Sequence, residues 1–201
     1  MGFEMRRKLK FRIGQETDST QLALVLDSAG RRLPSYLWGQ LAEPGQSVFE
    51  YGREKIRTDI IRKSFHKNWY VAETQNDFVG AFFGFLVEKP YPETDFTTLP
   101  ECLHPIIELE QLASGYWLLQ ALAILPEYRG KGFVRQLLDK VELVAKKTGA
   151  DRIALQVAEI NQVAVSIYQM NGYFELARRP YVSFPGSDDS GDYILMCKQL
   201  I

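Results

Sequence analysis

The spacing of apolar residues changes several times along the chain, and each change marks an expected element. Residues 8–13 alternate between polar and apolar, which is typical of a half-buried strand. Residues 18–30 have helical spacing and end at a glycine. A Ser-x-x-Glu capping box at Ser47 predicts a second helix, whose apolar side carries Phe49, Ile56, Ile60 and Ile61. Residues 33–46, between these helices, contain two prolines and are expected to form an ordered loop.

The middle of the chain predicts strands on either side of an irregular stretch. Residues 69–73 and 78–87 are apolar runs joined by a short Asn/Asp turn, which indicates an antiparallel hairpin. Residues 88–110 contain four prolines and are expected to be irregular. The run over residues 116–125 is almost entirely apolar and is closed by Pro126, so we expect a strand that is buried on both faces.

The second half of the chain completes the predicted architecture. Residues 117–157 have the pattern of a strand–helix–strand crossover, which makes its two strands parallel. A last helix and two closing strands are expected at 162–170, 174–179 and 193–198. The sequence therefore predicts a single domain over residues 1–201, of the α+β class. We expect a mixed, mostly antiparallel central sheet of about six or seven strands, flanked by about four helices.

Composition and charge narrow the functional classes. The chain has 24 basic and 25 acidic residues, a net charge of −1, which argues against nucleic-acid binding. Cys102 and Cys197 lie far apart with no ligand spacing around them, so neither a disulfide framework nor a metal site is expected. No apolar run reaches the roughly 18 residues of a membrane span, and the charged start is unlike a signal peptide. We therefore expect a cytoplasmic protein that does not bind a membrane.

The segment between the buried strand and the following helix is a candidate anion site. The strand ends at Pro126, and the helix begins near Gly132. Glycines in this turn allow the backbone to approach a ligand closely. The first N–H groups of a helix have no internal partner and lie at the positive end of its dipole, which suits a pyrophosphate. Arg129 and Lys131 add positive charge at the same place.

Three kinds of phosphate loop can be compared with this turn. The P-loop needs a leading Gly and a final Ser or Thr, and both are missing. The dinucleotide fingerprint needs a glycine where Arg135 stands. An Arg-x-x-Gly-x-small pattern formed by Arg129, Gly132 and Val134 instead resembles the coenzyme A loop of the GNAT superfamily of N-acetyltransferases, although Val134 is bulkier than the usual Gly or Ala.

A second motif supports the same resemblance, and the match runs through the whole chain. The stretch from Asn161 to Phe174 is similar to the family's second signature, at its usual distance downstream: Asn161-Gln162-x-Ala164-x-x-Ile167-Tyr168-x-x-Asn171-Gly172-Tyr173-Phe174. The resemblance implies the acyl-CoA N-acyltransferase fold, in which the two parallel strands splay apart. It also implies acetyl-CoA as co-substrate, with no metal.

The resemblance assigns roles to individual residues. It implies direct attack by an acceptor amine, with a backbone N–H of Ala123 or a neighbour polarising the thioester carbonyl. Tyr168 matches the tyrosine that protonates the leaving sulfur. Asn161 either contacts the pantetheine amide or only caps its helix. The expected acetyl-CoA contacts are Leu122, Ala123, Ile124, Arg129, Gly130, Lys131, Gly132, Phe133, Val134, Asn161 and Tyr168.

The acceptor and its base are less well defined by the sequence. Glu110 is a candidate general base, with Glu108 as a second, and surface charge is the alternative for both. Residues 88–110 are strongly acidic, so a cleft lined by them would favour a cationic amine. Aromatic walls of that cleft are expected from Tyr36, Trp38, Tyr91, Phe96 and Trp117.

Other functions stay open at this point. We expect the acceptor to be a small-molecule or peptide amine. The alternatives are a non-catalytic module that senses acyl-CoA, and a protein-interaction domain with a degenerate loop. The unpaired edge left by the closing strands allows a homodimer.

Overall fold

A computed structural model describes residues 8–75 and 77–200 of the chain. Within these residues seven strands form one sheet, and six α-helices flank it. The strands are β1 (Lys10–Ile13), β2 (Tyr70–Thr74), β3 (Asp77–Leu86), β4 (Trp117–Ile124), β5 (Arg152–Ala158), β6 (Phe174–Pro180) and β7 (Asp192–Gln199). The helices are α1 (Ser19–Ala29), α2 (Leu33–Gly39), α3 (Val48–Thr58), α4 (His104–Leu112), α5 (Phe133–Lys146) and α6 (Gln162–Met170).

The sheet has the order β1-β2-β3-β4-β5-β7-β6. Every neighbouring pair is antiparallel except β4 and β5, which are parallel. The prediction of a mixed, mostly antiparallel sheet of six or seven strands is therefore confirmed. The expected crossover is also present, because α5 connects the two parallel strands.

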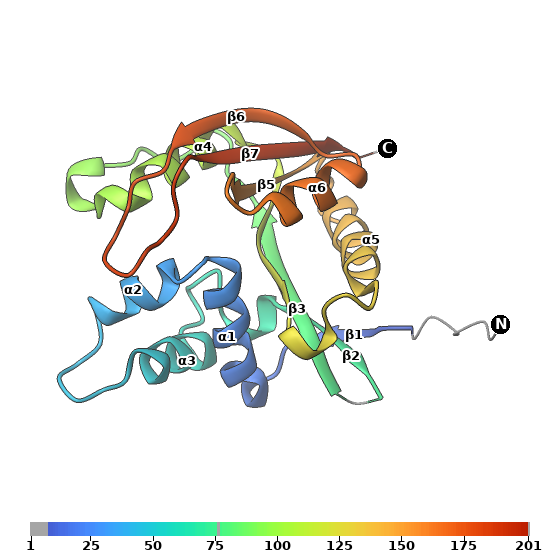
Figure 1. The fold of residues 1–201 in the computed structure, drawn as a ribbon, viewed down its shortest axis with the longest axis horizontal. Helices are drawn as coiled ribbons and strands as arrows, with labels where there is room; N and C mark the ends of the chain where they lie inside the picture. Colours follow the sequence, from blue (N-terminus) through green and yellow to red (C-terminus); the bar gives the residue numbers. More distant parts are fainter. Residues whose placement is uncertain (1–7, 76, 201) are drawn as a thin grey trace.

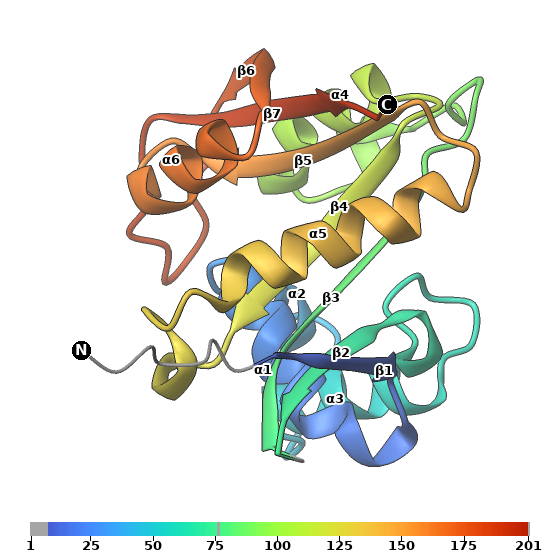
Figure 2. The same ribbon diagram turned by 90° about the vertical axis from the view of Figure 1, so that its right-hand side faces the viewer.

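Helices cover both faces of the sheet. Helices α5 and α6 pack on one face, in a core cluster that includes Leu137, Leu138 and Val165. Helices α1, α2 and α3 pack on the opposite face, around Trp38 and Trp69. Figure 1 shows these two groups on either side of β3, and Figure 2 shows α5 crossing in front of the strands while α4 lies behind them.

A β-bulge in β4 changes which side chains face which helices. The register with β3 shifts so that Phe83 lies opposite Ala121 while Gly84 lies opposite Leu119, which leaves Gln120 as the extra residue. Before the bulge, Leu119 packs in the α5 cluster. After it, Ala121 packs in the α1 cluster. In a regular strand, residues two positions apart point to the same face, so the bulge reverses the face to which Ala121 points.

The parallel pair separates immediately at this bulge. Strands β4 and β5 are paired only from Trp117 to Leu119, against Ile153 to Leu155. Both strands continue beyond that point, β4 along β3 and β5 along β7. A bulge bends the strand that carries it, so β4 and β5 diverge and leave a space between them.

Two predicted loops contain helices. The expected loop at 33–46 begins with α2, and the expected irregular stretch at 88–110 leads into α4. Pro34 and Pro105 both lie in the first turn of their helices, where the missing N–H would have no partner and the fixed φ is compatible with the helix. The two additional helices, α2 and α4, explain why six α-helices are present among the described residues where about four were expected.

The helix that follows Ser47 is shorter than its apolar pattern suggested. The Ser47 side chain accepts a hydrogen bond from the Glu50 N–H, which confirms the predicted cap. The helix then ends at Thr58, because the Asp59 carboxylate accepts the N–H of Ile61 in a local turn. Ile60 and Ile61, expected on its buried side, are 73% and 91% exposed.

Among the described residues, no helix combines the length and apolarity that a bilayer crossing requires. The same residues contain no group of three or more His, Cys, Asp or Glu side chains placed to hold a metal ion. Cys102 and Cys197 are both buried and are not bonded to each other.

The close approach of β3 and β4 at the bulge predicts a strong effect of a single methyl group. A Cβ at Gly84 would lie 2.3 Å from the Leu118 carbonyl oxygen and 2.5 Å from the Trp117 ring. We expect Gly84→Ala to lower the free energy of unfolding by about 1–3 kcal/mol through overpacking.

Gly39→Ala is the matched control, because its Cβ would meet only Val48 at 3.6 Å, an ordinary contact. That variant should be neutral or gain roughly 0.4–1 kcal/mol by restricting the unfolded chain. Urea unfolding of both variants measures the difference, and equal stabilities would show that β3 can move away from β4.

Candidate functional site

A cavity of about 920 Å³ occupies the space between the diverging ends of β4 and β5. This volume is in the range of ligand-binding pockets, which are roughly 300–1,000 Å³. Residues from both faces of the sheet line it. They come from the α1–α2 region, from residues around the start of α4, from β4, β5 and β7, from the turn before α5, and from α6.

The turn before α5 forms one end of this cavity. A short 3₁₀ turn at Pro126–Tyr128 leads into Gly130 and Gly132, which have φ of 72° and 76°. Such positive values favour glycine. Both glycines line the cavity, and a Cβ on either would meet no protein atom within 4 Å. The first amides of α5, at Phe133 and Val134, are therefore presented beside open space, as an anion-binding helix start requires.

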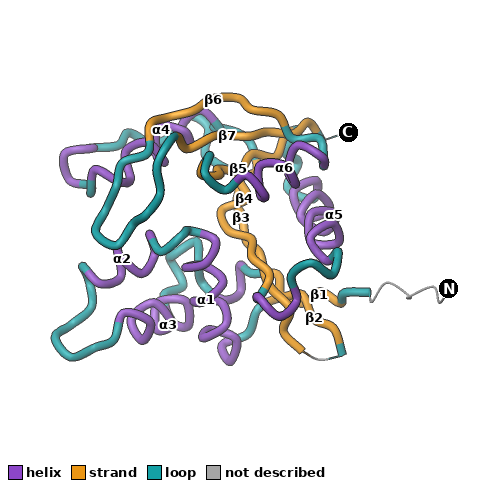
Figure 3. Tube along the Cα trace, viewed as in Figure 1, coloured by secondary structure: helices purple, strands orange, loops and turns teal. Residues whose placement is uncertain are grey.

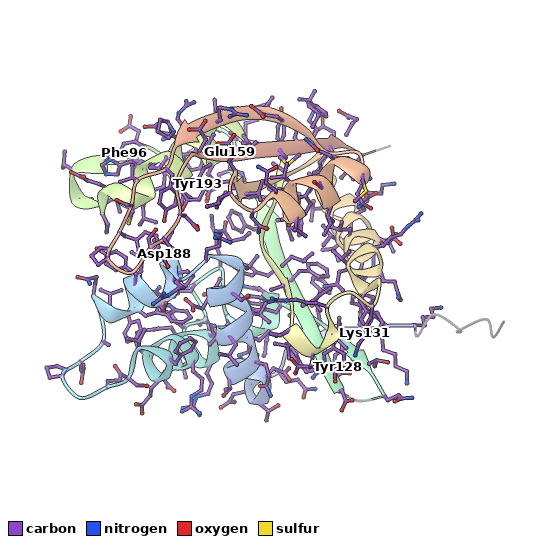
Figure 4. The ribbon with its side chains drawn as sticks, viewed as in Figure 1. Phe96, Tyr128, Lys131, Glu159, Asp188 and Tyr193 are labelled. Atoms are coloured by element: carbon purple, nitrogen blue, oxygen red, sulfur yellow. The ribbon has the colours of Figure 1, made fainter. Side chains whose placement is uncertain are left out.

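Arg129 holds this turn in place. Its Nε donates to the Ile124 carbonyl at 3.0 Å, and one terminal nitrogen lies 3.4 Å from the Ser28 hydroxyl. Arg129 therefore connects the turn to the end of β4 and to α1, and it also lines the cavity. Lys131 does not line it, and its ammonium lies 5.1 Å from the centre of the Tyr128 ring. Figure 4 shows Lys131 and Tyr128 at the turn.

The backbone of β4 presents only alternate residues to the cavity. The Leu125 N–H donates to a β3 carbonyl at 2.9 Å, so Ala123, two residues earlier, also directs its backbone toward β3. Leu122 and Ile124 direct theirs to the other side, where β5 has moved away. Their amides, rather than that of Ala123, are the ones that a ligand in the cavity can reach. The Ala123 side chain still lines the cavity.

Tyr168 lies on α6 with its side chain on the cavity wall. Burial raises the pKa of Tyr168 to about 12. Its ring packs edge-on against Tyr173, with the ring centres 5.7 Å apart. No described residue forms a hydrogen bond with the Tyr168 hydroxyl, which leaves this group available to a ligand.

Asn161 serves as a helix cap and also borders the cavity. Its side-chain oxygen accepts the Ala164 N–H at 3.3 Å, at the start of α6. The same side chain is part of the cavity lining. The cap leaves the amide nitrogen of Asn161 free to donate to a ligand.

The two candidate bases lie away from these groups. Glu110 on α4 accepts a hydrogen bond from the Tyr91 hydroxyl at 3.2 Å and lies 3.7 Å from the Lys63 ammonium. Glu108 pairs with Arg179 at 2.5 Å. Neither carboxylate lines the cavity, so the structure does not bring Glu110 together with Tyr168.

The acidic cleft expected from residues 88–110 is not found among the described lining residues. This segment contributes Leu103 and Ile106, which are both apolar, and none of its acids. The expected aromatic walls are also absent from the lining. Phe96, for example, lies at the outer edge of the molecule, as Figure 4 shows.

Sequence reasoning missed several lining residues. Gln120 and Gln156 are polar residues within otherwise apolar strands, and both line the cavity. The Gln156 side chain donates to the Ile106 carbonyl at 2.9 Å, which joins β5 to α4. A polar residue within an otherwise apolar strand is the sequence signal that could have identified these two glutamines. Arg31 and Tyr193 had no such signal.

Comparison with a sequence model of a protein family gives an independent assignment. The model described as the acetyltransferase (GNAT) family matches residues 36–173, which is more than half of the chain. This region includes the turn before α5 and all of α6.

Individual relatives agree with this assignment. An uncharacterised N-acetyltransferase, YobR, of Bacillus subtilis (strain 168) is 36% identical over 67 residues, or 33% of this chain. The match covers only 27% of the length of that relative.

Two solved structures show the same fold. A spermidine N-acetyltransferase from Vibrio cholerae, in complex with CoA and spermine, has a TM-score of 0.61 at 21% identity, over 96% of this chain and 95% of its own. A putative acetyltransferase from Salmonella typhimurium, yncA, with its cofactor acetyl-CoA, has a TM-score of 0.58 at 13% identity, over 96% and 94%. At these identities the likeness concerns the fold alone.

The glycine geometry of the turn gives a testable prediction. Gly132→Ala should weaken coenzyme A binding by about tenfold or more: in the free protein an alanine lets the turn relax away from a positive φ that costs it roughly 1–2 kcal/mol, and binding must restore that φ, with about 1.4 kcal/mol corresponding to one decade. The new methyl also enters the cavity. Isothermal titration with coenzyme A measures the dissociation constant.

Gly149→Ala is the matched control at the other end of the same helix. Gly149 also has a positive φ, 80°, and open space around its Cβ, but it does not line the cavity. Both variants should lose similar stability, while only Gly132→Ala loses affinity. Equal affinities would mean that the turn does not hold the ligand.

Proposed function

This chain belongs to the acetyltransferase (GNAT) family, and we propose that it transfers the acetyl group of acetyl-CoA to a primary amine by direct attack. One observation carries the proposal. A single cavity is bordered by the first amides of α5, by the unpaired edge of β4 and by the Tyr168 hydroxyl. These are the groups needed to hold a diphosphate, polarise a carbonyl and protonate a leaving group.

The donor fits the half of the cavity between α5 and α6. The amides of Gly132, Phe133 and Val134, with Arg129 beside them, provide donors and positive charge for the pyrophosphate. The pantetheine arm has room between β4 and α6, where Asn161 offers its amide nitrogen. The V. cholerae and S. typhimurium proteins of this fold bind CoA and acetyl-CoA, respectively, which supports this placement.

The diverging strands provide the electrophilic part of the site. The co-substrate supplies an acetyl group activated as a thioester. An N–H of Leu122 or Ile124, fixed in the sheet and directed into the cavity, stabilises negative charge on the acetyl oxygen. Because these donors are part of the backbone, they need no rearrangement when the charge develops.

Tyr168 is the proposed acid. With a pKa of about 12 its hydroxyl is protonated at neutral pH, so it can donate toward the sulfur as the carbon–sulfur bond breaks. Burial disfavours the phenolate, which promotes recovery of the proton that the amine releases. The proton balance of each turnover is then closed, because the amine loses one proton and the sulfur gains one.

The amine must lose a proton without direct help from a carboxylate. No Asp or Glu is present among the described residues that line the cavity. We propose that the ammonium first loses one proton through water and attacks as the neutral amine, and that the second proton, released once the carbon–nitrogen bond has formed, is the one that returns to Tyr168. The polar side chains of Gln120 and Gln156 can orient such water at the fork of the strands.

Tyr168→Phe tests the acid and separates an enzyme from a sensor. Loss of a positioned general acid should lower kcat by about 100- to 10,000-fold while the dissociation constant of acetyl-CoA stays within about twofold. Thiol release measures turnover, and titration measures affinity. An unchanged kcat would remove Tyr168 from the mechanism. A wild type that binds acetyl-CoA without acetylating any amine would favour the sensor.

Tyr173→Phe is the matched control for this test. Tyr173 touches Tyr168, but its hydroxyl is buried with no partner among the described residues. Removing it should leave kcat unchanged and should not destabilise the fold, since an unsatisfied buried polar group is lost.

The raised pKa of Tyr168 predicts the alkaline side of the pH profile. An acid is active while it is protonated, so a group with a pKa of about 12 loses activity only near that pH. Single-turnover rates should therefore not fall between about pH 7 and pH 10. A decline with a midpoint below pH 9 that is abolished by Tyr168→Phe would contradict this assignment.

A further inference from the structure

The cavity has a second half, on the face of the sheet that carries α1, α2 and α4. Its walls are mostly apolar and are formed by Leu33, Pro34, Leu37, Leu103, Ile106 and Tyr193. We call these six residues the acceptor chamber. On β5, Val157 faces α5 while Gln156 bonds to α4, so the chamber and the donor half lie on opposite faces of the sheet. They meet where β4 and β5 diverge.

The chamber is held by contacts between distant parts of the chain. Arg31, in the turn between α1 and α2, forms an ion pair with Asp189 in the β6–β7 connection. The rings of Tyr36 and Phe184 stack with centres 5.1 Å apart across the same junction. Figure 3 shows this connection extending from the β6–β7 end of the sheet toward α2. The wall of the chamber is therefore built from segments that contact one another directly.

The backbone at this junction is strained in the way that functional sites often are. Arg31 and Arg32 are consecutive non-glycine residues with φ of 49° and 72°. Arg31 lines the cavity, and Leu33, two residues further on, is buried in the chamber wall. The turn thus places the start of α2 against the cavity at a local conformational cost.

The charges around the cavity argue against a polycationic ligand. Among the described lining residues the only charged ones are Arg31 and Arg129, and both are cationic. Asp189, the partner of Arg31, is not among them. An ammonium that entered the chamber would lose its water without gaining a carboxylate, which is unfavourable. An apolar group would instead gain from leaving water.

We propose that the acceptor is a monoamine with an apolar body. The acceptor chamber buries this body, and the single nitrogen of the amine reaches the fork of β4 and β5. This inference rests on the proposed acetyl transfer and specifies its substrate class. It separates this chain from the V. cholerae protein of the same fold, which is a spermidine N-acetyltransferase.

A pair of acceptors tests the inference on the wild-type protein. With acetyl-CoA at saturation, kcat/KM for 2-phenylethylamine should exceed that for spermidine by at least about 100-fold. Thiol release gives the rates, and mass spectrometry confirms the acetylated product. Comparable rates, or a preference for spermidine, would overturn the inference and leave the acetyl transfer intact.

A binding measurement keeps the two proposals distinguishable. Titration of the coenzyme A-loaded protein with the same amines should show binding of 2-phenylethylamine and much weaker binding of spermidine. If the amine binds but no acetylation occurs, the proposed function fails while the chamber assignment stands. If 2-phenylethylamine neither binds nor reacts, the chamber assignment fails.

A charge introduced into the chamber should change the preference. Ile106→Glu places a carboxylate on the wall, and the ratio of kcat/KM for spermidine to that for 2-phenylethylamine should rise at least about tenfold. Leu112→Glu is the matched control, because Leu112 is on the same helix, is 47% exposed and does not line the cavity. Its ratio should equal that of the wild type.

Leu37→Glu gives a second test on α2, should Ile106→Glu fail to fold. Leu37 is half-buried and lines the chamber from α2. Retained coenzyme A affinity shows that either variant is folded. If a folded variant leaves the acceptor ratio unchanged, the chamber does not hold the acceptor.

Discussion

Hydrogen bonding between β4 and β5 stops after three residue pairs, and the site depends on this interruption. Gln120 adds one residue to β4 directly after the last pair, which bends the strand and reverses the side to which the next residues point. The chain beyond it keeps its bonds to β3 and leaves the other edge unpaired. Without the extra residue, a continuous parallel ladder would fill the space in which both substrates are proposed to meet.

The features that were predictable from the sequence are local ones. Apolar patterns identified all seven strands as well as α5 and α6, because burial of one face imposes a regular spacing and burial of both faces leaves a continuous apolar run. The turn before α5 was identified because glycine at Gly130 and Gly132 reflects a backbone requirement that is met within a few residues. Tyr168 was found through a motif and not through physical reasoning.

The missed features depend on position within an element or on tertiary contacts. Pro34 and Pro105 favour an irregular chain when only the sequence is considered, whereas in a first helical turn proline is compatible with the helix. Glu110 is a candidate base in the sequence, yet it lies on α4 and pairs with Tyr91 and Lys63. The chamber brings together α2, α4 and β7, and no sequence pattern records that assembly.

The opening between β4 and β5 also has a kinetic consequence. The two substrates are proposed to occupy halves of the cavity on opposite faces of the sheet, so neither has to pass through the site of the other and both can be bound together. The cavity offers no cysteine to carry the acetyl group, since Cys102 and Cys197 are buried outside its lining. In the proposed arrangement the two substrates form a ternary complex, and the acetyl group passes through the sheet from one face to the other.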